Sequence, residues 1–364
     1  MSAPGTPSAA ARPAVLVALF YTSVVLALLA THAWDPRFFA TVGPEWERHD
    51  PGLLKQADGS IYFAFATDPL GATSHHARFR TARLLYPLAA HALALGRANR
   101  IGWSLLLVNL AAIVLGTELM HRLLARRGLS PWLALVYGAW GGLGAALLHD
   151  TAEAFAYLCV LAGIEAQERG HPILAGTGYL SGALSRETTL LLAVPYLLLS
   201  RRDRRALSLV ALAVLAAWGT WLGIVALVGT GAMIQPVAQP RLPLAGFLAT
   251  RRLDLPITLV YIIAPAVLVL GWAARELWRR PTDASLWAAS LNALLVLQLP
   301  PQTAEIFWHS GRLATGLVAA TLLAAPLAAS APRLWRALAI LLASWVSWTI
   351  AIALRFLFWT VTPW

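Results

Sequence analysis

The stretch PAVLVALFYTSVVLALLAT, from Pro13 to Thr31, contains no charged side chain. A membrane-spanning helix needs roughly 20 consecutive apolar residues, and this run meets that length. A cleaved signal peptide is the alternative, because Arg12 precedes the run and small residues follow it near Ala33. The run is longer than the roughly 7–15 apolar residues of a signal-peptide core, so we predict a membrane anchor.

Apolar sequence of this kind makes up most of the remaining chain. Of the 364 residues, 59% are hydrophobic and 12% are charged, whereas soluble domains have about 45–50% and about 25%. Further apolar runs lie at 101–121, 131–148, 152–167, 171–185, 187–200, 206–229, 255–273, 284–299, 311–330 and 336–360. The composition excludes a water-soluble globule. It predicts an all-α polytopic membrane protein, with about eleven transmembrane helices in a single transmembrane domain over 1–364.

Arginines in the short connections predict the orientation of these helices. Basic residues near the ends of spans stay on the cytoplasmic side, and a cytoplasmic N-terminus places every basic short connection there. The arginines concerned are Arg122, Arg126, Arg127, Arg169, Arg201, Arg202, Arg204, Arg205, Arg275, Arg279, Arg280, Arg333 and Arg336. With eleven spans and a cytoplasmic N-terminus, the C-terminus is external. This topology requires that 84–96 does not cross the membrane.

A long polar segment, 32–100, follows the first span and forms the first external loop in this topology. Within it, 84–96 is short, contains Pro87 and His91 and is flanked by arginines. These features favour a juxtamembrane helix in the interface over a helix that spans roughly 30 Å. The apolar and aromatic stretch 60–66 predicts a second short helix on the membrane.

Asp58 opens the segment DGSIYFAFATDP, at the start of this second short helix. The positive end of the helix dipole favours an ionised carboxylate there, and an ionised carboxylate can act as a general base. The local sequence taken alone favours a simpler alternative, in which Asp58 is the N-cap of a surface helix.

Three arginines, Arg78, Arg80 and Arg83, precede the interfacial helix on the external side. This position opposes the preference of basic residues for the cytoplasm. A guanidinium group binds phosphate oxygens through two parallel hydrogen bonds. We therefore expect these arginines to bind a phosphate or pyrophosphate at the membrane surface, with anionic lipid headgroups or neighbouring acids as the alternative partners.

Further ionisable residues fall on the external side at the ends of predicted spans, where such groups are functional candidates by default. They are Asp150 and Glu153 in HDTAE, Arg186 and Glu187 in SRET, and His309 and Arg312 in FWHSGR. If helical, Asp150 and Glu153 share one helix face. Helix capping and salt bridges between helices are the structural alternative, which we favour for Glu187 and not for Asp150. We expect all these stretches to meet in one external pocket, where the Asp58 carboxylate faces a cluster of guanidinium groups.

Several other kinds of site are excluded. Cys159 is the only cysteine, so the chain has neither an intrachain disulfide nor a cysteine-based metal centre, and we assign no metal ligand. Basic residues outnumber acidic ones, 28 to 17, but the apolar bulk indicates anionic lipid-linked ligands and membrane lipids, not nucleic acid. The sequence has no phosphate loop, dinucleotide-binding fingerprint or serine-hydrolase elbow, which argues against ATP-driven transport.

The order of these features resembles the GT-C superfamily of membrane glycosyltransferases. That order is one span, a loop in which an aspartate opens a juxtamembrane helix, a second juxtamembrane helix with a proline, and a bundle bracketed by arginines. DGSIYFAFATDP, RFRTARLLYPLAAHAL, HDTAEAFAYLCVLAG and LSRETTLLL look like segments of its bacterial branch. The resemblance covers mainly 55–200 and is weaker at FWHSGRLATGLVAA. By this resemblance, 101–200 holds the helices of the shared module and 201–364 holds variable C-terminal helices.

This resemblance implies transfer of a hexosyl or pentosyl group from a polyprenyl phosphate or pyrophosphate carrier. The acceptor would be a glycan, lipid or protein on the external face of a bacterial inner membrane. Asp58 would be the base, Asp150 matches a second acidic position of the family, and arginines would hold the phosphate. Relatives often carry a second acid beside the first, where this chain has Gly59, so a divalent metal is left open and no other cofactor is expected.

Two other classes of protein remain as alternatives. A transporter or flippase of a lipid-linked or anionic solute binds near the bilayer midplane, commonly between repeats with broken helices. The sequence has no visible repeat, and Glu118, the acid nearest to a span interior, lies at the cytoplasmic end of its span. A non-catalytic membrane scaffold would not need the external group of ionisable residues.

Overall fold

The computed structural model describes residues 13–41, 58–69, 82–199, 204–228, 244–248, 255–300, 303, 307–329 and 332–361. Within these ranges every regular element is a helix, and there is no strand. The prediction of an all-α protein is therefore confirmed for the described part of the chain.

The helices follow one another along the whole described sequence. The first are α1 (Pro13–Thr31), α2 (Arg37–Thr41), α4 (Asp58–Thr67), α6 (Leu85–Leu93) and α7 (Ile101–Arg126). The middle ones are α8 (Ala134–Gly138), α9 (Gly141–Leu148), α10 (Glu153–Glu168), α11 (Pro172–Ser185), α12 (Leu190–Leu199) and α13 (Arg204–Val228). The last are α14 (Ala245–Leu248), α15 (Leu255–Thr258), α16 (Ala264–Arg279), α17 (Ala284–Leu297), α19 (Phe307–Leu313), α20 (Thr315–Ala324), α21 (Pro326–Ala329) and α22 (Pro332–Val361).

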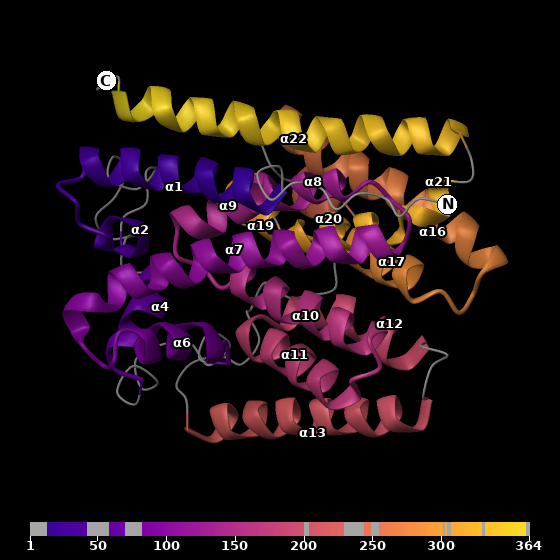
Figure 1. Cartoon of the computed structure of the whole chain (residues 1–364), viewed down its shortest axis with the longest axis horizontal. Helices are drawn as coiled ribbons and strands as arrows, with labels where there is room; N and C mark the ends of the chain where they lie inside the picture. The colour runs from indigo at the N-terminus through magenta and orange to yellow at the C-terminus, as the bar shows by residue number, and fades with distance from the viewer. Residues whose placement is uncertain are drawn as a thin grey trace, which may run out of the picture.

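The long helices lie roughly side by side in one elongated bundle (Figure 1). α7 and α10 pack together in its middle, α1 and α22 lie along one edge, and α13 lies along the opposite edge. α17 packs against α12, α16 and α20. The short helices α4 and α6 pack on each other and on α7, so the first loop folds back onto the bundle.

Small residues let α10 and α11 approach closely. A Cβ atom added at Gly178 of α11 would lie 2.7 Å from the carbonyl oxygen of Cys159 and 2.7 Å from the backbone nitrogen of Gly163, both on α10. Only glycine permits this approach of two backbones. Such contacts are typical of helices in membranes, where lipid removes the apolar driving force and close packing stabilises the pair.

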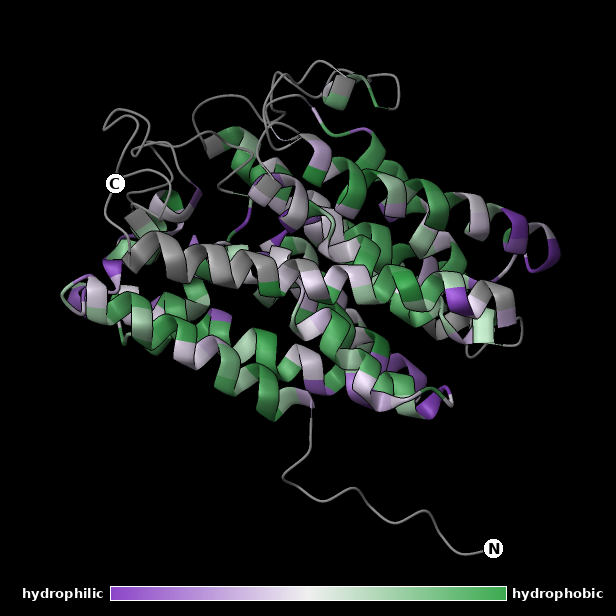
Figure 2. Ribbon diagram, turned by 90° about the horizontal axis from the view of Figure 1, so that it is seen from above, coloured by the Kyte–Doolittle hydropathy of each residue, from purple (hydrophilic) through white to green (hydrophobic). Residues whose placement is uncertain are grey.

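Four described helices are long and apolar enough to cross a membrane: Pro13–Thr31, Ala98–Arg126, Ser208–Leu227 and Pro256–Arg279. A fifth span results if α8 and α9, which meet at a bend of 45°, are counted as one. Figure 2 shows apolar residues along the lengths of the helices and hydrophilic residues mostly at helix ends and in connections. These features are those of a membrane-embedded protein. Within the described residues, each predicted apolar run contains one or more helices, and the number of eleven spans stays a prediction.

Two of the short helices in the first loop, α4 and α6, occur where the sequence predicted them. α4 begins at Asp58, and α6 ends at Leu93 because Leu95 and Gly96 adopt left-handed backbone φ angles of 53° and 70°. A ring nitrogen of His91 on α6 lies 2.7 Å from the carbonyl oxygen of Ala66 on α4, which joins the two helices. Their position at a membrane surface stays a prediction.

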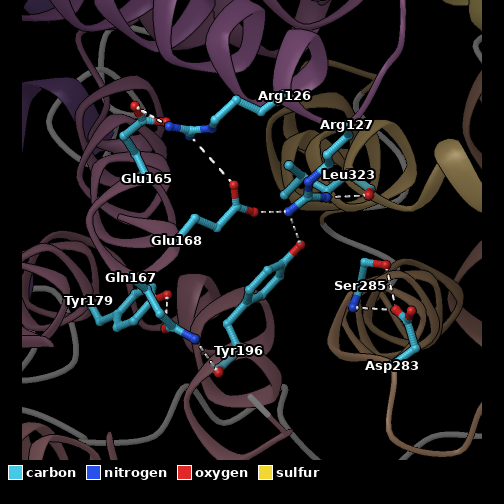
Figure 3. A network of polar contacts seen from close by, with 10 residues as sticks. All are labelled: Arg126, Arg127, Glu165, Gln167, Glu168, Tyr179, Tyr196, Asp283, Ser285 and Leu323. Carbon is cyan, nitrogen blue, oxygen red and sulfur yellow. Dashed lines mark hydrogen bonds and ion pairs between the residues drawn. The ribbon is translucent and has the colours of Figure 1, made fainter. Parts of the chain in front are cut away.

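A polar network ties the end of α10 to the helices around it (Figure 3). Arg127, directly after α7, donates to Glu168 of α10 at 2.5 Å, to the Tyr196 hydroxyl of α12 at 3.2 Å and to the backbone carbonyl of Leu323 on α20. Gln167 of α10 donates to the backbone carbonyl of Tyr196 at 2.7 Å. Arg127, which the sequence marked only for topology, thus connects α7 with three other helices.

We expect Arg127→Gln to lower the free energy of unfolding by about 2–4 kcal/mol, because Glu168 keeps only the more distant Arg126, at 3.5 Å, and the Tyr196 hydroxyl and the Leu323 carbonyl lose their charged donor. Unfolding in detergent, followed by circular dichroism, measures this loss. Arg122→Gln is the matched control: Arg122 pairs with Glu118 one turn earlier and its side chain is 49% exposed. Such a pair contributes about 0.3–0.5 kcal/mol. Equal losses in the two variants would contradict the role of Arg127.

Candidate functional site

The predicted ionisable residues in the described ranges gather at one end of the bundle, around the start of α10. They are Asp58 on α4, Arg83 before α6, Asp150 and Glu153 at the start of α10, Arg186 and Glu187 between α11 and α12, and His309 and Arg312 on α19. Arg78 and Arg80 lie outside the described residues. Segments distant in sequence therefore supply one site.

Asp58 is the first residue of α4, and its Oδ2 atom lies 3.5 Å from Nη2 of Arg312 on α19. This pair joins the first loop to the C-terminal helices, so a role as N-cap does not describe Asp58 fully. The Asp58 side chain is 21% exposed, whereas the Arg312 side chain is 7% exposed. Asp58 is thus the more open partner of the pair.

Glu153 is the first residue of α10 and is completely buried. Its Oε1 atom lies 3.0 Å from Nη1 of Arg186 and 3.7 Å from Nε of Arg312. Burial raises the pKa of Glu153, but the charges of Arg186 and Arg312 lower it by more, so the pKa lies below its ordinary value. Glu153 is therefore a buried carboxylate that faces two guanidinium groups.

Arg83 and Glu187 form an ion pair through two hydrogen bonds. Nε of Arg83 donates to Oε2 at 3.0 Å, and Nη2 donates to Oε1 at 2.6 Å. Burial raises the pKa of Glu187, but the charge and hydrogen bonds of Arg83 and the charge of Arg186 lower it by more, to about 2. The structural alternative for Glu187, a salt bridge between elements, is confirmed.

Tyr62 links these groups of charges. It lies on α4 one turn after Asp58 and is buried. The charged groups that act on its hydroxyl are those of Arg83, Asp58, Arg186 and Glu153. The ion pairs therefore form one unit, which we name the acid–arginine cluster: Asp58, Arg83, Glu153, Arg186, Glu187 and Arg312.

The acid–arginine cluster contains polar atoms without hydrogen bonds. In the described part of the chain, Nε and Nη1 of Arg186, Nε of Arg312 and both carboxylate oxygens of Glu153 are buried and have no hydrogen-bond partner in suitable geometry. Few buried polar groups in proteins lack a partner, and those that do indicate water, an ion or a ligand. Nη1 of Arg186 and Nε of Arg312 face Oε1 of Glu153 at 3.0 Å and 3.7 Å, so these atoms are paired through charge and not through a hydrogen bond of suitable geometry.

The charges of this cluster balance, with three acids and three arginines. Burial, Arg312 and His309 lower the pKa of the neighbouring His149 to about 3, so His149 is neutral at neutral pH. The expectation of a single carboxylate facing several guanidinium groups was wrong. A salt bridge of Glu187 was among the sequence-based expectations, whereas the pairing of Glu153 with Arg186 and Arg312 was not.

Asp150 differs from the other acids. It lies between α9 and α10, is completely buried and has a left-handed backbone φ of 45°. Neither carboxyl oxygen has a hydrogen bond of normal geometry within the described ranges. Burial raises the pKa of Asp150 well above its ordinary value, and the nearby Asn109 offsets this only in part. Asp150 and Glu153 do not share a helix face, because α10 begins at Glu153.

Sequence reasoning missed three residues of the site, Tyr62, His149 and Tyr157. Tyr157 is completely buried on α10, and the charges of Glu153 and Arg186 act on it. Each tyrosine follows an acid of the cluster by four residues, Asp58 and Glu153 respectively, and so lies on the same helix face. This spacing was the signal that could have identified both tyrosines.

No group of three or more His, Cys, Asp or Glu side chains suited to a metal ion occurs in the described ranges. Among known proteins, no family model, curated protein or solved structure matches the chain. The resemblance to the GT-C superfamily therefore stays a prediction.

The burial of Asp150 predicts how the stability of the protein depends on pH. Because its folded-state pKa is raised, the folded protein keeps a proton that the unfolded chain releases, so this residue lowers stability as pH rises above about 4. We expect Asp150→Asn to abolish that decline and to become more stable than the parent between about pH 5 and pH 8. Unfolding measured across this pH range checks the result, and an unchanged pH dependence would contradict it.

Glu153→Gln is the counterpart of Asp150→Asn at a buried acid that pairs with arginines, Arg186 and Arg312. Glu153 has a lowered pKa, so its contribution to stability is present above about pH 4.5 and is lost as pH falls through the folded-state pKa. We expect Glu153→Gln to cost about 3–5 kcal/mol at neutral pH, because Arg186 and Arg312 lose their buried counter-ion. The two acids should thus respond in opposite directions, and a gain in stability for both variants would refute the assignment.

Proposed function

We propose that the protein is a GT-C type glycosyltransferase that moves a sugar from a polyprenyl phosphate or pyrophosphate carrier to an acceptor. The observation that carries the proposal is the pair of Asp58 and Arg312 at 3.5 Å. It lies beside the buried guanidinium group of Arg186, which faces Glu153, at one end of an apolar bundle. A carboxylate next to phosphate-binding groups is the arrangement that transfer from a lipid phosphate requires.

In the proposed reaction the acceptor oxygen attacks the anomeric carbon and its proton passes to Asp58. The bond between that carbon and the carrier phosphate breaks, and the phosphate leaves with the electron pair. Arg312 and Arg186 stabilise the negative charge that grows on the leaving oxygen, because their donor atoms are fixed in a buried setting. Attack from the side opposite the leaving group inverts the configuration of the sugar.

The acids of the cluster have different tasks in this proposal. Glu153 keeps Arg186 and Arg312 charged and in place, and Glu187 does the same for Arg83. The pair of Asp58 and Arg312, at 3.5 Å, is longer than the pairs of Arg83 with Glu187 and of Arg186 with Glu153, and Asp58 is partly exposed. An entering phosphate therefore replaces Asp58 as the partner of Arg312, which releases the carboxylate to accept a proton.

The proposal includes the topology expected from the arginines. With eleven spans and a cytoplasmic N-terminus, the acid–arginine cluster lies on the external face of a bacterial inner membrane, and α4 and α6 lie at the membrane surface. The carrier's tail would stay in the bilayer beside the bundle, and the acceptor is a glycan, lipid or protein. A divalent metal at the phosphate is left open.

A transporter or flippase is the second candidate, and one observation favours it. α8 and α9 are separated by a bend of 45°, and transporters bind solutes at such discontinuous helices. The same acid–arginine cluster would then bind an anionic headgroup without chemistry. Reconstituted protein that moves a lipid-linked sugar across vesicles and forms no glycosidic product would support this candidate.

Replacement of Asp58 tests the proposed transferase. In membranes supplied with polyprenyl-phosphate-linked sugars, we expect Asp58→Asn to lower the rate of transfer by about 10²–10⁴-fold, the contribution of a general base. Asp68→Asn is the matched control, because Asp68 lies just beyond the other end of α4. We expect this control to change the rate by less than about twofold. Undiminished transfer by folded Asp58→Asn protein would exclude the base.

A further inference from the structure

The short helix α9 and the residues at its two ends contact the chain directly next to two members of the acid–arginine cluster, Asp58 and Arg312. α9 has eight residues, packs against α19, which carries Arg312, and is followed by His149. Eight helical residues span about 12 Å. α9 is therefore a short, fixed spacer between the two contacts, and neither contact uses a charged side chain of α9.

The first contact lies at the start of α9. Trp140 is completely buried, and its Nε1 atom donates a hydrogen bond of 3.0 Å to the carbonyl oxygen of Gly311, which directly precedes Arg312. Gly142 lies against the same carbonyl, and a Cβ atom at this position would overlap both that oxygen and Nε1 of Trp140. The backbone of α19 is thus fixed one residue away from Arg312.

The second contact lies after the end of α9. Gly59, directly after Asp58, packs on the backbone carbonyl of His149, and a Cβ atom at Gly59 would overlap that oxygen. The same Cβ atom would lie 2.8 Å from the carbonyl oxygen of Ala40. The backbone contact between Gly59 and His149 therefore fixes the position of the first turn of α4 relative to the end of α9. This contact is one residue away from Asp58.

We propose that α9 sets the separation of Asp58 and Arg312, and that Trp140 is the positioning residue for Arg312. Both contacts are made by backbone atoms immediately next to the two charged residues, so a shift at either end of α9 changes the distance between the charges. The use of this separation for catalysis rests on the proposed function. The effect of α9 on the distance between Asp58 and Arg312 is a property of the folded protein and does not depend on any reaction.

Trp140→Phe removes the hydrogen bond to Gly311 and keeps an aromatic ring. The experiment measures the coupling between Asp58 and Arg312 by a double-mutant cycle of Asp58→Asn and Arg312→Gln, with unfolding in mixed detergent and SDS micelles. In the parent we expect the pair to change the unfolding constant by about 3–30-fold beyond the sum of the single changes. In the Trp140→Phe background we expect less than about twofold coupling.

Trp345→Phe is the matched control. Trp345 is also buried and donates from Nε1 at 2.9 Å to a backbone carbonyl, that of Tyr261, and its ring packs edge-on against Trp140. Trp345 therefore shares with Trp140 its burial and a hydrogen bond to a backbone carbonyl, but its acceptor lies outside the segment of Arg312. We expect Trp345→Phe to lower stability and to preserve the coupling. Full coupling in Trp140→Phe protein, or its loss in both tryptophan variants, would overturn the positioning role.

A second measurement separates this inference from the proposed function. It compares the affinities for a 55-carbon polyprenyl phosphate and for the corresponding polyprenol, which lacks the phosphate, by native mass spectrometry. We expect Arg312→Gln to lower the preference for the phosphate about 10–100-fold and Trp140→Phe to lower it about 3–10-fold. If Arg312→Gln leaves the preference unchanged, the proposed phosphate site fails while the coupling experiment still decides the role of α9.

Discussion

The contact of Glu153 with Arg186 and Arg312 is the interaction on which the site depends. All three side chains are buried, and each buried ion needs an opposite charge, because the loss of hydration costs several kcal/mol per ion. Glu153 opens α10, Arg186 follows α11, and Arg312 belongs to α19. The requirement for neutrality therefore fixes three elements relative to one another, and Asp58 joins them through Arg312.

The other end of α10 satisfies the same requirement with different residues. There Glu165 and Glu168 pair with Arg126 and Arg127 of the neighbouring α7 segment. Glu153 and Glu165 are separated by about 18 Å along the helix, less than the roughly 30 Å of a hydrocarbon core. A helix of this length that crosses a bilayer therefore keeps at least one of its two charged ends below the headgroup level.

The sequence allowed prediction of the helices and of most charged residues of the site. Long apolar runs gave the positions of α1 and α7, since such runs form helices wherever they are buried or meet lipid. Pairing partners could not be predicted: Glu153 and Arg312 meet only through the tertiary fold. The left-handed backbone of Asp150 and the contact of Trp140 with Gly311 were equally inaccessible, because no local pattern encodes them.

The equal numbers of acids and arginines in the acid–arginine cluster have a consequence for how a ligand arrives. Charges that cancel within a few ångströms produce a potential that decays much faster than that of a net charge, and salt weakens it further. Such a group does not attract an anion from bulk solvent over long distances. In the proposed function, a lipid-borne headgroup would instead reach the acid–arginine cluster by lateral diffusion within the leaflet, so encounter would depend on the two-dimensional density of the carrier and hardly on ionic strength.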